Sequence, residues 1–166
     1  KSDGTIWFTD PPYGIKPRER EQPANYVFRL DPDGTLTVVA DDFDMPNGLC
    51  FSPDESLLYI ADSSDRHHVR VFDVRPDNTL ANGRVFAVVE PGVPDGMRMD
   101  TEGRLYSTAG DGIHVYAPDG ELLGIIEVPQ SPANCTFGDA DKRTLYITAR
   151  TSLYAIRLAA VGAQTP

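Results

Sequence analysis

Short runs in which apolar and polar residues alternate are the dominant pattern along the chain. Examples are NYVFRL (25–30), HVRVFDV (68–74), GIHVY (112–116) and SLYAIRL (152–158), and Gly, Pro, Asp or Asn stands near most of their ends. Alternation with a period of two predicts half-buried β-strands, and the bounding residues predict turns. No stretch shows a convincing apolar period of 3.6 residues, so the pattern predicts an all-β protein.

The strands recur as a repeat. Three segments beginning at Pro46, Pro94 and Pro132 each contain a proline, a short apolar strand, a polar turn and a second strand with the pair Leu-Tyr. The opening segment SDGTIWFTD (2–10) matches the second half of a fourth copy. An uneven interval of about 40–50 residues is typical of propeller blades whose outer loops differ in length.

We therefore predict a β-propeller built from four-stranded antiparallel blades. Residues 1–158 would form about three and a half blades, fewer than the 4–8 of a closed propeller. This stretch is expected to be the C-terminal half of a longer domain and to need an upstream half of the same propeller. The segment 159–166, AAVGAQTP, carries no pattern and is expected to be a frayed tail.

Two polar residues stand where an apolar strand would begin. Asn47 and Asp95 both follow a proline and precede a glycine, and the repeat places them at equivalent positions of neighbouring blades. The first strand of a blade lines the central channel, so both side chains are expected near its mouth. Amide and carboxylate oxygens are ligands that Ca²⁺ or Mg²⁺ prefers. The alternative is that each is an ordinary β-turn, since Pro-Asn-Gly and Pro-Asp-Gly are favourable turn sequences.

Composition narrows the classes of partner. A net charge of -10 and a pI near 4.6 argue against nucleic acid and against an anionic membrane surface. No apolar run approaches the roughly 20 residues that span a bilayer. The compartment stays open, with the cytoplasm slightly favoured over the periplasm.

The cysteines and histidines do not indicate a metal site of their own. Cys50 and Cys135 each lie in an apolar strand, so we expect two buried free thiols, with a disulfide between them as the alternative. The three histidines have no metal-ligand spacing with one another or with cysteine, which argues against a zinc site made of Cys and His.

Four motifs carry a resemblance to a known family. They are GTIWFTDPPYG (4–14), MPNGLCFSPDESLLYIADS (45–63), VPDGMRMDTEGRLYST (93–108) and NCTFGDADKRTLYITA (134–149). Together, in this order, they resemble the gluconolactonase / regucalcin (senescence marker protein) / luciferin-regenerating-enzyme family, and the first resembles bacterial gluconolactonases in particular. The chain departs from the family where Asp139 replaces a second glycine.

The resemblance implies a six-bladed propeller with one divalent cation at the channel mouth. Ca²⁺ is the expected ion, with Zn²⁺ or Mg²⁺ as alternatives. The family binds its metal through a Glu, two Asn and an Asp. The second Asn matches Asn47 and the Asp matches Asp95, whereas the other two ligands would lie in the upstream half.

The resemblance also implies a lactonase that opens small sugar lactones. The cation would polarise the carbonyl, and Asp95 would be the catalytic residue that accepts a proton from the attacking water. The alternatives are another ester or organophosphate hydrolase on the same scaffold, or a non-catalytic binding propeller.

Four further residues are candidates for substrate contact. Asp10 and Tyr13 lie on a Pro-rich loop that could reach over the channel mouth, with an ordinary turn as the alternative. Ser63 and Arg150 follow matching strands, with strand capping as the alternative.

Other polar residues near the predicted strands are assigned structural roles. Asn134 lies one place beyond equivalence with Asn47 and Asp95 and is read as a strand-start residue. His67 and His68 are expected on a solvated loop, although one of them could donate a proton near the rim.

Overall fold

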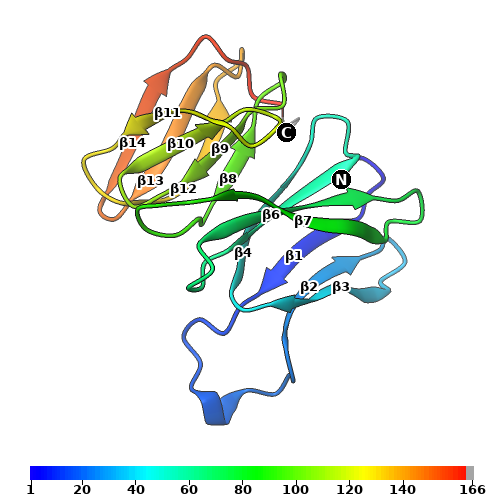
Figure 1. The fold of residues 1–166 in the computed structure, drawn as a ribbon. Coiled ribbons are helices and arrows are strands. Elements are labelled where there is room, and N and C mark those ends of the chain that lie inside the picture. The colour runs from blue at the N-terminus through cyan, green and yellow to red at the C-terminus, as the bar shows by residue number, and fades with distance from the viewer. Residues whose placement is uncertain (164–166) are drawn as a thin grey trace.

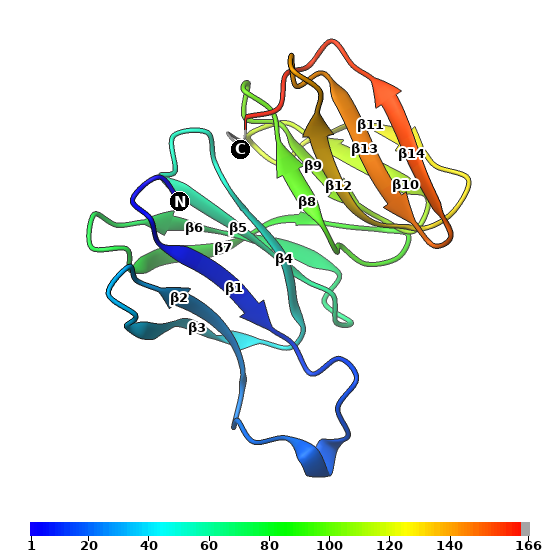
Figure 2. The same ribbon diagram turned by 180° about the vertical axis from the view of Figure 1, so that it is seen from behind.

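The structure is a computed structural model that describes residues 1–163, which form four antiparallel sheets (Figures 1 and 2). The first sheet contains β1 (Ile6–Asp10), β2 (Asn25–Leu30) and β3 (Leu36–Phe43). The second contains β4 (Pro46–Phe51), β5 (Leu57–Asp62), β6 (His68–Val74) and β7 (Leu80–Val88). In each sheet, strands that follow one another in the chain are hydrogen-bonded neighbours.

The third and fourth sheets repeat this order. The third contains β8 (Met97–Met99), β9 (Leu105–Thr108), β10 (Gly112–Tyr116) and β11 (Leu122–Glu127). The fourth contains β12 (Pro132–Gly138), β13 (Thr144–Ala149) and β14 (Ser152–Arg157). The predicted all-β class with four-stranded antiparallel sheets is confirmed, whereas the number of blades in a closed ring stays a prediction. We call β4, β8 and β12 the inner strands, because β8 contacts both of the others.

The register of the sheets confirms the repeat. The tyrosine of each Leu-Tyr pair lies opposite the same position of its inner strand, in the pairs Tyr59–Cys50, Tyr106–Arg98 and Tyr146–Thr136. The residues three places before these inner-strand positions are Asn47, Asp95 and Ala133, which are therefore equivalent in the repeat. Asn134 therefore lies one place further along, as the sequence predicted.

Apolar side chains fill the spaces between successive sheets. One buried cluster joins the first and second sheets, a second joins the second and third, and a third joins the third and fourth. Their largest fully buried members include Leu58, Ile60, Met97, Met99, Leu105, Ile113, Leu145 and Ile147. Because side chains of a strand alternate between its two faces, one sheet contributes to two clusters. This packing fixes the ends of the inner strands relative to one another.

The two cysteines are buried free thiols, as predicted. Cys50 lies on β4 and Cys135 on β12, and burial raises the pKa of each thiol to about 12. Since the thiolate is the form that binds metals and reacts, these side chains act as small apolar residues at neutral pH.

The end of the described chain is held against the third and fourth sheets. Its backbone bonds are Thr101 N to Val161 O (2.8 Å), Gly162 N to Lys142 O (2.8 Å) and Ala163 N to Met99 O (3.0 Å). The prediction of a frayed tail over 159–166 is thus corrected for residues 161–163, because the backbone next to β8 offers them hydrogen-bond partners. Residues 164–166 lie outside the described residues.

A long loop joins β1 to β2 and contains the short 3₁₀ helix η1 (Pro17–Glu19). Both views show this loop extending away from the sheets (Figures 1 and 2). Within residues 1–163, no helix has the length and apolar character needed to cross a membrane.

Candidate functional site

A β-bulge at the start of β4 explains why a polar residue begins this strand. The register between β4 and β5 shifts between Pro46 and Leu49, so Asn47 and Gly48 lie outside the regular ladder. A bulge bends the strand and redirects its side chains, which is why bulges occur next to active sites. The backbone of Asn47 is held by Thr9 of the first sheet, whose Oγ1 donates to the Asn47 carbonyl (2.9 Å).

The Asn47 side chain lies among polar groups from three other segments. Its Nδ2 is 3.0 Å from Ser63 Oγ and 3.4 Å from the Tyr13 hydroxyl, and the side chain lies near enough to the Asp95 carboxylate to influence the pKa of that group. We call Tyr13, Asn47, Ser63 and Asp95 the rim cluster. The two predicted metal ligands therefore lie next to each other across neighbouring sheets.

Asp95 is held by its own sheet and is partly shielded from water. Its backbone N–H donates to Thr108 Oγ1 (3.0 Å) at the end of β9. Burial raises the pKa of its carboxyl above the usual value of 3.8, and the hydrogen bond from Asn47 offsets part of that increase. A carboxylate of raised pKa is a better proton acceptor than an exposed one.

Glycines allow the inner strands to approach one another at this end. A Cβ atom on Gly48 would lie 2.1 Å from the Asp95 carbonyl oxygen, and one on Gly96 would lie 2.2 Å from Asn134 Oδ1. Any larger residue would force the strands apart, so glycine is a steric requirement at both positions. The Asn-Gly and Asp-Gly pairs therefore combine a polar side chain with the space that brings the next sheet close.

Asp62, at the end of β5, organises the backbone that leads into the site. Its side chain is fully buried and accepts hydrogen bonds from the backbone N–H groups of Met45 (2.9 Å), Asp44 (3.1 Å) and Ser64 (3.2 Å). Burial raises the pKa of this carboxyl, but hydrogen bonds from Ser64, Met45 and Asp44 outweigh burial and leave it lowered. The sequence analysis did not single out Asp62. The available signal was the repeat itself, since Asp62 ends β5 as Asp10 ends β1.

Replacing Asp62 by alanine should lower the free energy of unfolding by at least about 2 kcal/mol, because buried N–H donors lose their acceptor. The Asp62 pKa is lowered, so its contribution is fully present above the ordinary value of 3.8 and is lost as the pH falls through the lower folded-state pKa. Urea denaturation at pH 7 and pH 3 measures both effects. The exposed neighbour Asp65, changed to alanine, is the control; equal stability of the two variants at pH 7 would contradict this role.

The two remaining residues predicted to contact substrate, Arg150 and Asp10, have different surroundings. Arg150 is exposed and shares a hollow of about 440 Å³ with Asp95, between the third and fourth sheets. Asp10 accepts a hydrogen bond from Gln22 Nε2 (2.7 Å) of its own loop. The loop thus brings Tyr13 to Asn47 while Asp10 faces the loop itself, and substrate contact by these residues stays a prediction.

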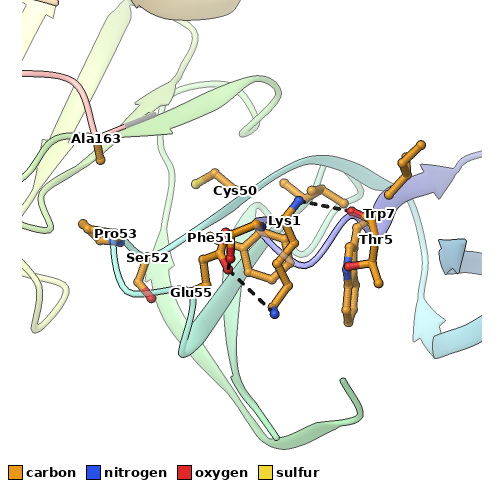
Figure 3. Close-up of a pocket in the computed structure, with 12 residues that line it drawn as sticks. Lys1, Thr5, Trp7, Cys50, Phe51, Ser52, Pro53, Glu55 and Ala163 are labelled. Atoms are coloured by element: carbon orange, nitrogen blue, oxygen red, sulfur yellow. Dashed lines mark hydrogen bonds and ion pairs between the residues drawn. The ribbon is translucent and has the colours of Figure 1, made fainter. Parts of the chain in front are cut away.

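A larger hollow, of about 630 Å³, lies at the opposite end of β4 (Figure 3). Its lining includes Trp7, Cys50, Phe51 and Glu55, and Glu55 accepts hydrogen bonds from Ser2 there. None of the predicted site residues lines it. Size alone therefore does not locate the candidate site in this chain.

The rim cluster fits part of a site for a hard divalent cation. An amide and a carboxylate that lie next to each other offer oxygen donors of the kind that Ca²⁺ and Mg²⁺ take, but Ca²⁺ binds 6–8 oxygens. Within residues 1–163, no group of three or more His, Cys, Asp and Glu side chains is placed to hold a metal. Asn47 and Asp95 would therefore supply two protein ligands of a larger set.

Fold and rim together define a class of protein: repeated antiparallel sheets that present an amide and a carboxylate at one end of neighbouring inner strands. The chain belongs to the family described as SMP-30/Gluconolactonase/LRE-like region, which matches residues 1–151. The family resemblance read from the four sequence motifs is thereby confirmed.

Individual relatives agree with this assignment. The chain is 38% identical to a gluconolactonase of Zymomonas mobilis over 96% of its own length and 49% of the relative's, and 35% identical to an L-arabinolactonase of Azospirillum brasilense over 85% and 49%. Among solved structures, a gluconolactonase of Xanthomonas campestris superposes with a TM-score of 0.89 at 42% identity, over 95% of this chain and 55% of that one. The chain thus spans about half the length of the curated relatives it matches.

Proposed function

We propose that this chain is part of a metal-dependent hydrolase that opens sugar lactones. The observation that carries the proposal is the placement of Asn47 and Asp95 next to each other, from neighbouring sheets, in a chain of the gluconolactonase family. The names of its relatives, gluconolactonase and L-arabinolactonase, indicate the substrate class.

The proposal includes the architecture. The four sheets suit one part of a β-propeller, expected to have six blades, whose upstream half would cover the first sheet. On the face of β1 that points away from the second sheet, Ile6 and Phe8 are 59% and 39% exposed. Exposed apolar side chains on one sheet face are typical of a surface that another element covers.

Asn47 and Asp95 would hold the cation, with Ca²⁺ expected and Zn²⁺ or Mg²⁺ as alternatives. A bound divalent cation supplies Lewis-acid polarisation of a lactone carbonyl. Asp95 would accept a proton from water that attacks this carbonyl; burial raises the pKa of its carboxyl, whereas a bound cation lowers it, so part of its effect would be to orient the water. Asn47 is neutral, so it would contribute an oxygen without cancelling the charge of the ion.

Removal of divalent cations should abolish lactone hydrolysis by the complete protein. The reason is that neither rim side chain alone stabilises the charge that develops on the carbonyl oxygen. Acid release from gluconolactone and arabinonolactone is measured before chelation, after chelation, and after adding back Ca²⁺, Zn²⁺ or Mg²⁺ separately. A panel of aryl esters and organophosphates run in parallel tests the alternative hydrolases. Full activity in the presence of chelator would remove the metal from the proposal, and inactivity toward every lactone would contradict the function.

A further inference from the structure

Ser63 connects the two candidate metal ligands. It follows β5, and its Oγ donates a hydrogen bond to the carbonyl oxygen of Pro94, the residue before Asp95. The same Oγ is 3.0 Å from Asn47 Nδ2. One hydroxyl group therefore ties the side chain of one ligand to the backbone that carries the other.

Counting protons fixes the orientation of the Asn47 amide. A serine hydroxyl has one proton to donate, and a backbone carbonyl can only accept. Since Ser63 donates to the Pro94 carbonyl, its oxygen can only accept from Asn47. The amide atom that faces Ser63 must then be the NH₂ group. The Asn47 carbonyl oxygen Oδ1 lies on the other side of Cγ and is directed away from Ser63.

This hydroxyl is particular to one sheet of the repeat. Counting four residues on from the tyrosine of each Leu-Tyr pair gives Ser63, Gly110 and Arg150 as equivalent positions. Neither a glycine nor an arginine can make the two bonds that Ser63 makes. A hydroxyl needed only for building a sheet of this type would be expected in more than one copy, whereas this one stands where the two candidate ligands meet.

We propose that Ser63 is a positioning residue for the cation site, and that it does not act by touching substrate. It holds the Asn47 amide with Oδ1 available to a cation, and it holds the Pro94–Asp95 backbone at a fixed separation from Asn47. Outer-shell hydrogen bonds of this kind typically change metal affinity by 10–100-fold. The inference rests on the proposed function, because it assigns Ser63 a role in that same site.

The test is calorimetric titration of the metal-free complete protein with Ca²⁺, repeated with Zn²⁺ and Mg²⁺. Ser63→Ala should weaken cation binding by about 10-fold or more. Ser63→Thr keeps the hydroxyl group and should bind within a few-fold of the wild type. The Michaelis parameters for gluconolactone, measured at saturating cation, should show a loss in kcat with little change in KM.

The matched control is Ser56→Ala. Ser56 lies in the β4–β5 turn at the far end of β4, and among residues 1–163 its hydroxyl bonds only to Asp54, so cation binding should be unchanged. Circular dichroism and thermal melting show whether each variant is folded. Should Ser63→Ala fail to fold, Ser63→Cys, of similar size but a weaker hydrogen-bonding group, replaces it and should bind the cation less tightly than Ser63→Thr.

Two outcomes would overturn the inference, and they differ from failure of the proposed function. Unchanged cation affinity in Ser63→Ala, or in Ser63→Cys where that variant replaces it, together with a raised KM would make Ser63 a substrate contact. Equal affinity and equal kinetics in every variant would leave Ser63 without a role. If the wild-type protein binds none of the three ions, the proposed function fails and this inference fails with it.

Discussion

Replacing Asp95 by asparagine should reduce kcat/KM for gluconolactone hydrolysis by about 10³-fold or more, if the complete protein acts as proposed. Asparagine keeps the shape of the side chain and one carbonyl oxygen, but it removes the negative charge and the proton-accepting oxygen. The half-buried Asp95 carboxylate lies against Asn47, so a neutral side chain there would leave the rim cluster without an anionic ligand. The rate of acid release at saturating cation measures the loss.

Cation titration separates the two roles assigned to Asp95. Loss of both cation binding and hydrolysis in Asp95→Asn would identify Asp95 as a ligand on which activity depends. Retained binding with lost hydrolysis would identify it mainly as the proton acceptor. Hydrolysis above about one tenth of the wild-type rate would contradict both roles, since a positioned base is worth 10²–10⁴-fold.

Asp119→Asn is the matched control for this experiment. Asp119 stands in the same local sequence, Pro-Asp-Gly, but it lies in the exposed turn between β10 and β11, where its carboxylate accepts from the backbone N–H of Glu121 (3.1 Å). Activity and cation binding should be unchanged in this variant. The comparison tests whether position in the repeat, and not the turn sequence itself, gives Asp95 its function.

The sheets could be predicted from sequence because each strand carries its own local signal. Period-two alternation and the Leu-Tyr pairs mark the strands, and the register later places Tyr59, Tyr106 and Tyr146 at the same relative position. The contacts of residues 161–163 could not be predicted in this way. They pair with backbone near Met99 and Lys142, and such a partner is set by the tertiary arrangement, which leaves no pattern in AAVGAQTP itself.

The rim cluster was partly predictable for the same reason. The sequence repeat alone aligns Asn47 with Asp95, because both interrupt an apolar pattern at the same place. Asp62 was missed because an aspartate at the end of a strand also fits a solvated turn. Its burial depends on the contact of Asp44 and Met45 with the end of β5. The pattern of residues along a single strand does not show this contact.

Replacing Gly48 by alanine should open the contact between the second and third sheets. The added Cβ would lie 2.1 Å from the Asp95 carbonyl oxygen and 3.0 Å from Gly96 Cα, where ordinary contact begins at 3.4 Å. Both obstacles are backbone atoms, so no rotation of a side chain relieves them. The sheets must separate by about 1 Å, a displacement that near an active site can cost about 10²-fold in rate.

The expected results are a lower free energy of unfolding, by about 1–3 kcal/mol as for other overpacked sites, and weaker cation binding. Gly124→Ala is the control, because Gly124 lies on β11 and, apart from its chain neighbours, no atom of the described residues is within 4 Å of the added Cβ. Urea denaturation and Ca²⁺ titration of both variants measure the difference. A stable Gly48→Ala protein with normal cation affinity would show that the two inner strands do not approach as closely as the site requires.

The positions of these glycines indicate why Gly48→Ala should weaken cation binding by more than its lower stability alone would cause. Gly48 and Gly96 stand where the neighbouring inner strand crosses, whereas Asn134 occupies the equivalent position on β12. Glycine is thus kept where Asp95 and Asn134 must approach, and a side chain is present at the third position. Gly48→Ala should therefore lose cation affinity even at temperatures where the protein remains folded, which titration well below the thermal midpoint would detect.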